Sequence, residues 1–96
     1  MDVMIKSFRC KETNKLFGGR FSKRLPPEIQ KRSKMRLDRI DAAIALDDLL
    51  VPPSHRLEAL ERDRKGEHSI RINDQWRVCF IWKDGNVYGV EITDYH

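Results

Sequence analysis

The sequence lacks a long hydrophobic run. Its apolar stretches are short and interrupted by charge, and the first ten residues already carry Asp2, Lys6 and Arg9. A membrane-spanning helix needs about 20 consecutive apolar residues, and a secretory signal peptide needs a continuous apolar core. We therefore expect neither element, and we expect a cytoplasmic protein.

Cysteine and histidine are scarce. The two cysteines, Cys10 and Cys79, are far apart, and the three histidines, His55, His68 and His96, are equally scattered. They do not have the close spacing of a metal site, and a nucleophilic thiol would need a base beside it. We expect free thiols that serve in packing. The sequence predicts no metal and no cofactor.

Positive charge, by contrast, is abundant and concentrated. The 96 residues, which fit one domain over 1–96, carry a net charge of +4. Residues 20–39 hold eight Lys and Arg against Glu28 and Asp38. This concentration is typical of proteins whose partners carry phosphates or carboxylates. A basic helix can also be no more than a solvated face, so the charge alone leaves both interpretations open.

The N-terminal half predicts a strand and two helices. Residues 3–9 alternate as a strand, and residues 11–17 form a short helix that ends at two glycines. A long helix is predicted over residues 27–46, because prolines open it and apolar residues recur with helical spacing. That stripe comprises Ile29, Leu37, Ile40 and Ile44, with Ser33 completing the spacing. Prolines 52 and 53 then predict an extended connector over 51–55.

The C-terminal half predicts strands. Residues 57–61 are expected to place Leu57 and Ala59 on one side of a strand. A hairpin over 69–80 with a loop at 74–76 would pair Ile72 with Val78. A second hairpin turns at residues 83–86, with a three-residue loop that pairs Trp82 with Tyr88 and Arg77 with Thr93. These elements form one helical layer on a largely antiparallel sheet, an α+β fold.

The face of this sheet away from the core is cationic. Strand alternation places Arg71, Asn73 and Arg77 on that face, and Tyr95 projects on the same side. Arginines held on a rigid sheet can bind phosphate oxygens in pairs. The alternative is that a small antiparallel sheet simply has a polar outer face.

The sequence ends in Asp94, Tyr95 and His96, a carboxylate, a phenol and an imidazole. Cleavage of RNA without a metal needs a base for the 2′-hydroxyl, cations for the phosphorane and an acid for the 5′-oxygen. A terminal carboxylate favours the protonated imidazole, so His96 suits the acid. Tyr95 is a poor base unless cations assist it, and Asp94 suits orienting His96 or capping the sheet. His55 is a second candidate base, or else an exposed loop histidine.

These segments resemble a known family. The runs IKSFRCKET and VPPSHRLEALERDRKGEHSIRINDQWRVCF and the ending EITDYH are similar to the HigB-type toxins, also called the plasmid killer family, of the RelE/ParE superfamily. The resemblance covers nearly the whole chain. It implies a RelE-like fold, two helices packed on a curved, mainly antiparallel sheet of about four to five strands.

The resemblance also implies a function. It implies a ribosome-dependent, metal-free messenger-RNA endonuclease that works in the A site of the 30S subunit. A HigA-type helix-turn-helix antitoxin would neutralise it, and operator DNA would be bound only through that antitoxin. The catalytic residues carried over are Arg71, Arg77, Asp94, Tyr95 and His96. The residues expected to contact RNA are His55, Arg56 and Asn73, with Lys31, Lys34, Arg36 and Arg39 on the basic helix.

Two other functions fit the same fold. A ParE-like protein of this superfamily would inhibit DNA gyrase, or another protein, without catalysis. A plain RNA-binding module would be harmless when expressed. The terminal DYH favours the nuclease, because inhibition by binding has no need of an acid/base group.

Overall fold

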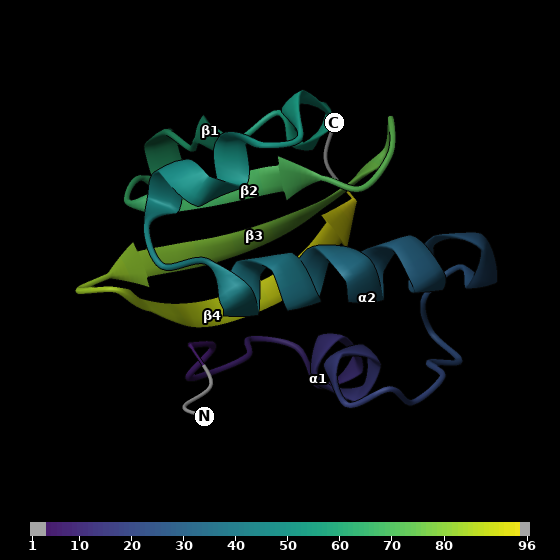
Figure 1. Cartoon of the computed structure of the whole chain (residues 1–96). Helices are drawn as coiled ribbons and strands as arrows, with labels where there is room; N and C mark the ends of the chain where they lie inside the picture. The colour runs from purple at the N-terminus through teal and green to yellow at the C-terminus, as the bar shows by residue number, and fades with distance from the viewer. Residues whose placement is uncertain (1–3, 95–96) are drawn as a thin grey trace.

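The fold has two layers, helices on one side and an antiparallel sheet on the other (Figure 1). The computed structural model describes residues 4–94. The helices are α1 (Lys11–Phe17) and α2 (Pro27–Ala42), and short 3-10 helices follow at η1 (Leu46–Leu50), η2 (Pro53–His55) and η3 (Arg62–Arg64). The four strands, in the order β1-β2-β3-β4, are β1 (Glu58–Ala59), β2 (Glu67–Arg71), β3 (Trp76–Lys83) and β4 (Asn86–Asp94). The predicted α+β class is confirmed.

The predicted first strand is wrong for its described residues. Residues 4–9 make isolated parallel bridges to β4, Ile5 with Val87 and Phe8 with Val90, and form no regular strand. Asp41 on α2 holds this segment, because its Oδ1 accepts hydrogen bonds from the Met4 and Ile5 amides at 2.9 and 3.0 Å. The segment therefore extends the sheet only loosely, beyond β4. The helix predicted at residues 11–17 is confirmed as α1.

Helix α2 ends at Ala42, four residues before the predicted residue 46. The reason is a competing cap: Asp48 Oδ2 accepts hydrogen bonds from the Ile44 and Ala45 amides at 2.9 and 3.0 Å. The chain therefore turns into η1, and Ile44 is 85% exposed instead of buried. The other members of the predicted stripe, Ile29, Ser33, Leu37 and Ile40, are buried as expected.

The β2–β3 hairpin has a longer loop than predicted. Ile70, not Ile72, pairs with Val78, and Arg71 pairs with Arg77. The Asn73 carboxamide oxygen causes the difference, because it accepts both the Gln75 and the Trp76 amides at 2.8 Å and so folds residues 72–75 into a wider turn. The error in register is two residues. An even shift keeps every side chain on its face, so both arginines still point away from the core.

The β3–β4 hairpin turns more tightly than predicted. Asp84 and Gly85 have φ of 53° and 78° and form a two-residue turn. Trp82 consequently pairs with Val87 instead of Tyr88. A bulge at Gly89, whose φ is 59°, restores the predicted register beyond it, with Val78 opposite Ile92 and Arg77 opposite Thr93.

Strand β1 is shorter than expected and its faces differ. It has two residues, Glu58 and Ala59, and the latter is exposed, whereas Leu60 is buried. Leu57 packs against the edge of the core. The strand predicted over 57–61 is therefore confirmed only at Glu58 and Ala59, and Leu57 lies before it.

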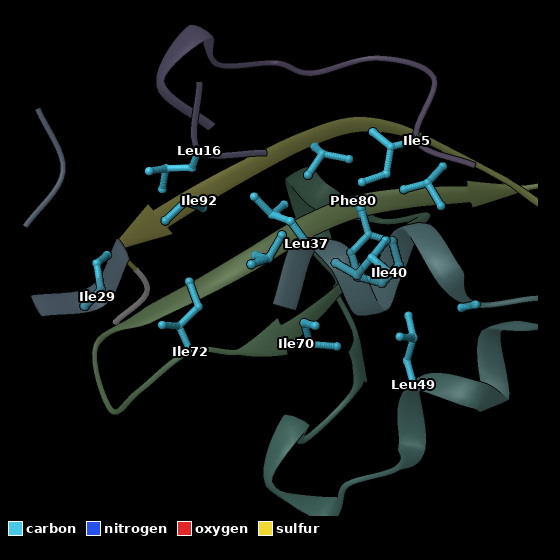
Figure 2. Packing of buried hydrophobic residues seen from close by; sticks show 14 residues of the cluster. Ile5, Leu16, Ile29, Leu37, Ile40, Leu49, Ile70, Ile72, Phe80 and Ile92 are labelled. Atoms are coloured by element: carbon cyan, nitrogen blue, oxygen red, sulfur yellow. The ribbon is translucent and has the colours of Figure 1, made fainter. Parts of the chain in front are cut away.

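The core lies between α2 and the inner face of the sheet (Figure 2). Leu37 and Ile40 of α2 contribute fully buried side chains from the helical side. Alternate positions of the strands contribute the remainder, and Leu49 of η1 closes one end. The buried strand residues are Ile70, Val78, Phe80, Val87, Val90 and Ile92. Among residues 4–94, no helix is long and apolar enough to cross a bilayer.

Candidate active site

A cationic cavity of about 290 Å³ opens on the outer face of the sheet, where β2 ends and β3 begins. Arg71 and Arg77 form a cross-strand pair there. The hydrogen bonds of the β2–β3 ladder fix the separation of their backbones. The cavity is lined by Arg56, Arg71, Asn73, Asp74 and Arg77.

Arg77 is the more firmly held arginine. Its side chain is 11% exposed and lies over β2. Nε donates to Ser69 Oγ at 2.7 Å, and Nη2 donates to the backbone carbonyls of Arg56 at 2.6 Å and Ser69 at 3.3 Å. Glu58 Oε1 lies 3.8 Å from Nε. The guanidinium is thus oriented before any substrate arrives, which lowers the entropic cost of binding an anion.

Arg71 is held more loosely. Its Nη2 forms an ion pair with Asp74 Oδ1, whose side chain is 97% exposed. An exposed pair of this kind contributes little stability, so an incoming phosphate can replace the carboxylate. The backbone is firmer than the side chain, because the Arg71 carbonyl accepts a hydrogen bond from Arg36 Nε at 2.9 Å.

Arg56 reaches the cavity from the connector before β1. It follows η2 with a left-handed φ of 46°, a conformation that costs free energy in a residue other than glycine. This turn directs its carbonyl toward Arg77, and Arg56 lines the cavity. The predicted extended connector over 51–55 is wrong, because η2 occupies residues 53–55.

Of the three terminal residues, only Asp94 lies within the described residues. It pairs with Trp76 at the end of β4 and is exposed, and its Oδ2 accepts a hydrogen bond from Gln75 Nε2 at 2.9 Å. Asp94 therefore ends the strand beside the loop at 72–75. Strand alternation places its side chain, like that of Ile92, on the face opposite Arg77. The predicted acid/base residues Tyr95 and His96 lie outside the described residues.

His55 is not exposed, contrary to expectation. Its side chain is fully buried, with Nδ1 3.2 Å from the Leu49 carbonyl oxygen. Burial lowers the pKa of the imidazole, and the positive charges of Arg36 and Arg39 lower it further. A buried imidazole cannot contact RNA in this conformation, so we do not place His55 in the site.

The predicted basic residues of α2 do not form one surface. Arg36 and Arg39 turn back to the chain, donating to the carbonyls of Arg71 and Val51. Burial lowers the pKa of Arg36. Lys31 and Lys34 instead line a cavity between α2 and the loop that follows α1. Lys34 pairs with Asp38, and its Nζ lies 5.2 Å from the centre of the Phe17 ring.

Sequence reasoning missed several supporting residues. Ser69 orients Arg77, Asp74 pairs with Arg71, and Arg32 Nη1 donates to the Ile72 carbonyl at 3.2 Å. The sequence held a signal for Ser69, because it alternates with Arg71 and therefore shares its face. Arg32 carried no comparable signal, since its partner is a backbone group that lies 40 positions along the chain.

The cysteines are structural within the described residues. Cys79 is fully buried on the outer side of the sheet, and burial raises its pKa to about 11. Cys10 is half-buried, and both are free thiols, as expected. A neutral buried thiol is a poor nucleophile. Residues 4–94 contain no cluster of three or more His, Cys, Asp or Glu side chains that could bind a metal.

The arrangement suits recognition of a phosphodiester. Two arginines from adjacent strands line an open cavity, and Arg56 of the connector also lines it. Guanidinium groups bind phosphate oxygens through paired N–H donors. They also stabilise the additional charge that develops on a phosphorane.

Known proteins are similar to this chain in sequence and in fold. Toxin HigB-1 of Vibrio cholerae serotype O1 is 44% identical over 61 residues, 64% of this chain and 64% of that protein. Endoribonuclease HigB of Proteus vulgaris is 33% identical over 93 residues, 97% of this chain and 100% of that protein. Among solved structures, YafQ from E. coli strain BL21(DE3) matches with a TM-score of 0.63 at 14% identity, over 97% of this chain and 93% of that one.

A chain of the YoeB–YefM complex from Staphylococcus aureus matches equally well, with a TM-score of 0.62 at 21% identity, over 100% of this chain and 99% of that one. At these identities the two structures establish a shared fold. The sequence profile of the HigB-like toxin family matches residues 6–96, nearly the whole chain. The protein therefore belongs to the HigB-like family, the RelE-like toxins of type II toxin–antitoxin systems.

Proposed function

We propose that this toxin is an endoribonuclease that cuts messenger RNA in the ribosomal A site by metal-independent attack of the 2′-hydroxyl. The observation that carries the proposal is the cavity with Arg71 and Arg77 paired across the strands. The Proteus vulgaris relative, called an endoribonuclease, matches over the full length of that protein. Its name supports the same reaction here.

The two arginines have different roles in this mechanism. Arg77, already oriented by Ser69 and Arg56, binds a non-bridging phosphate oxygen with little rearrangement. Arg71 exchanges Asp74 for the phosphate and follows the oxygens as charge accumulates on the phosphorane. The attacking 2′-oxygen forms a bond to phosphorus, and the bond to the 5′-oxygen breaks. The products are a 2′,3′-cyclic phosphate and a 5′-hydroxyl.

Proton transfer is assigned to the end of the chain. His96 is the general acid that protonates the departing 5′-oxygen, and Tyr95 is the candidate for the base. Asp94, which ends β4 and directly precedes these two residues in the sequence, is the candidate for orienting His96. Ribosome dependence follows if the ribosome holds the message in the in-line geometry that the free protein does not impose.

The proposed partner is a HigA-type antitoxin with a helix-turn-helix domain. Operator DNA is bound only through that antitoxin. The RNA contacts are assigned to Arg56 and Asn73 at the cavity and to Lys31 and Lys34 on α2. Arg36 and Arg39, which were also expected to contact RNA, instead hold the carbonyls of Arg71 and Val51. Because the proposed substrate is the translated message, the site of action is the cytoplasm.

The test is primer extension on a reporter message in a purified translation system, with and without ribosomes. Cuts within codons that need ribosomes are expected for the wild type. Arg71→Ala and His96→Gln should each lower cleavage by about 100-fold or more, because removal of one preorganised donor or of the acid costs about that much.

Arg77→Lys tests the geometry of the site. It keeps the charge but loses the planar fork that bonds Ser69 and Arg56, so cleavage should also fall. Lys65→Ala, at an exposed lysine outside the cavity lining, is the matched control and should cut normally. An intact message despite growth arrest would reject the nuclease and favour the ParE-like inhibitor.

A further inference from the structure

The cationic cavity that holds Arg71 and Arg77, called the catalytic cavity from here on, has two further hollows beside it. A second hollow of about 390 Å³ lies between α2 and the loop at 72–75, and Asn73 lines both it and the catalytic cavity. A third, of about 240 Å³, lies between α2 and the loop after α1, and Lys31 lines both it and the second. The three hollows therefore lie next to one another in a row that leads from the arginine pair to α2 and the loop after α1. We call the second and third hollows the α2 track.

The α2 track is cationic. Lys31 and Arg32 line the second hollow, and Arg20, Lys31 and Lys34 line the third. Glu28 is the one acidic side chain among the described lining residues of these two hollows. Arg32 is fixed by its hydrogen bond to the Ile72 carbonyl. Positive side chains thus continue from the catalytic cavity along the α2 track. They can bind phosphates that neighbour the reacting phosphate on the same strand.

Two large apolar side chains stand on this path. Phe21 is 64% exposed in the third hollow, and Met35 is 55% exposed in the second. Proteins that bind single-stranded nucleic acid combine a positive groove with exposed aromatic rings on which bases stack. A thioether also packs favourably on aromatic faces.

The backbone that presents Phe21 is anchored. Its neighbour Ser22 is fully buried, and Gln30 of α2 clamps it through both backbone groups, accepting from the Ser22 amide at 3.0 Å and donating to its carbonyl at 2.7 Å. Gln30 also donates to the Leu25 carbonyl at 2.8 Å. An exposed ring on a fixed backbone is a preorganised platform, so binding a base there costs little ordering entropy.

We propose that the α2 track binds the single-stranded message where it leaves the cleavage site, with Phe21 stacking on a base and Lys31 and Arg32 on its phosphates. This inference rests on the proposed function, because it assigns the substrate strand of the same site. The α2 track begins next to the catalytic cavity, at Asn73, and this position favours the message over ribosomal RNA or the antitoxin as the occupant. It also predicts that the enzyme contacts nucleotides beyond the scissile bond.

The first experiment measures binding without chemistry. A fluorescein-labelled 12-nucleotide single-stranded RNA of mixed A and U is titrated with the full chain carrying Arg71→Ala, and anisotropy gives the Kd. Adding Phe21→Ala should weaken binding about five-fold or more, which is the effect of losing one stacked base. Adding Lys31→Ala should reduce the slope of log Kd against log salt by about 0.7.

Ile44→Ala is the matched control, because Ile44 is 85% exposed but lies beyond the C-terminal end of α2, outside the lining of both hollows. It should bind RNA normally. Equal affinity of the Phe21 and Ile44 variants would overturn the track. Because the assay does not depend on cleavage, that result leaves the proposed function standing, and failure of the nuclease test leaves the binding result interpretable.

The second experiment identifies the occupant. The photoreactive residue p-benzoylphenylalanine replaces Phe21, and the toxin is irradiated on ribosomes that carry a reporter message. A crosslink to the message within a few nucleotides of the cut supports the track. A crosslink to ribosomal RNA alone would overturn the assignment, as would Phe21→Ala weakening the antitoxin complex while leaving the Kd for RNA unchanged.

Discussion

At the scale of the residue, burial separates the chemistry-bearing side chains into those that can react and those that support the fold. His55 and Cys79 are both fully buried, with the pKa of the imidazole lowered and that of the thiol raised to about 11. Both shifts favour the neutral form, which is the form that packs best in a low-dielectric interior. Arg71 and Arg77, by contrast, line the open cavity, where they can bind the substrate.

His55 therefore makes stability depend on pH. Because its pKa is lower in the folded chain than its ordinary value of 6.5, the unfolded chain binds the proton more tightly, and stability falls as pH drops below about 6.5. His55→Gln should flatten this dependence between pH 7 and pH 5, measured as the free energy of unfolding in urea. The pKa values of the Glu12 and Asp48 carboxyls are also lowered, but from ordinary values of 4.5 and 3.8. These groups therefore affect stability only at a lower pH than His55 does. An unchanged slope in the variant would show that His55 does not cause it.

At the scale of the element, strand β4 depends on one backbone irregularity. Gly89 has a φ of 59° at the bulge that realigns β3 and β4, so that Arg77 lies opposite Thr93. An added Cβ would meet no backbone atom closely, since its nearest neighbours are the ends of the Arg9 and Ile81 side chains at 3.6 and 3.7 Å. Any penalty for a side chain at this position thus comes from the left-handed conformation.

Gly89→Ala should consequently destabilise the fold by about 1–2 kcal/mol. Gly18→Ala is the control, because Gly18 has a φ of −77° and room for a methyl group, and it should be near neutral or slightly stabilising. Chemical denaturation of the two variants gives the comparison. Equal stabilities would mean that the bulge relaxes without strain.

At the scale of the whole molecule, one hydrophobic core packs α2, which carries part of the α2 track, against the sheet that carries the arginine pair. Leu37 and Ile40 pack on the inner face of the strands whose outer face carries Arg71 and Arg77. The position of α2 against the sheet therefore sets the relation between the two halves of the proposed RNA path. The same packing supplies much of the stability of a small domain.

Leu37→Ala should destabilise the protein by about 2–5 kcal/mol, because Leu37 is fully buried and its truncation leaves a cavity. Leu50→Ala, at a leucine that is 53% exposed, should cost far less. Thermal and urea unfolding of both variants measures the difference. A Leu37 variant as stable as the Leu50 variant would contradict the assignment of the core.

The sequence determined the features that depend on local chemistry. Alternation fixed the faces of β2 and β3, so Arg71 and Arg77 were placed correctly on the outer side even though the predicted hairpin register was wrong by two residues. Glycine marked the C-terminal end of α1, and proline marked the start of α2. The motifs near Arg71 and at the end of the chain indicated the family.

Only the tertiary structure decided the features that depend on distant partners. Asp48 ended α2 early, Asn73 widened the β2–β3 loop, and η2 buried His55. The exposed position of Phe21 depends on Gln30 of α2, which hydrogen-bonds the backbone of Ser22 in the loop after α1. A polar side chain shows its chemistry in the sequence, but the backbone group that it bonds is chosen by the fold.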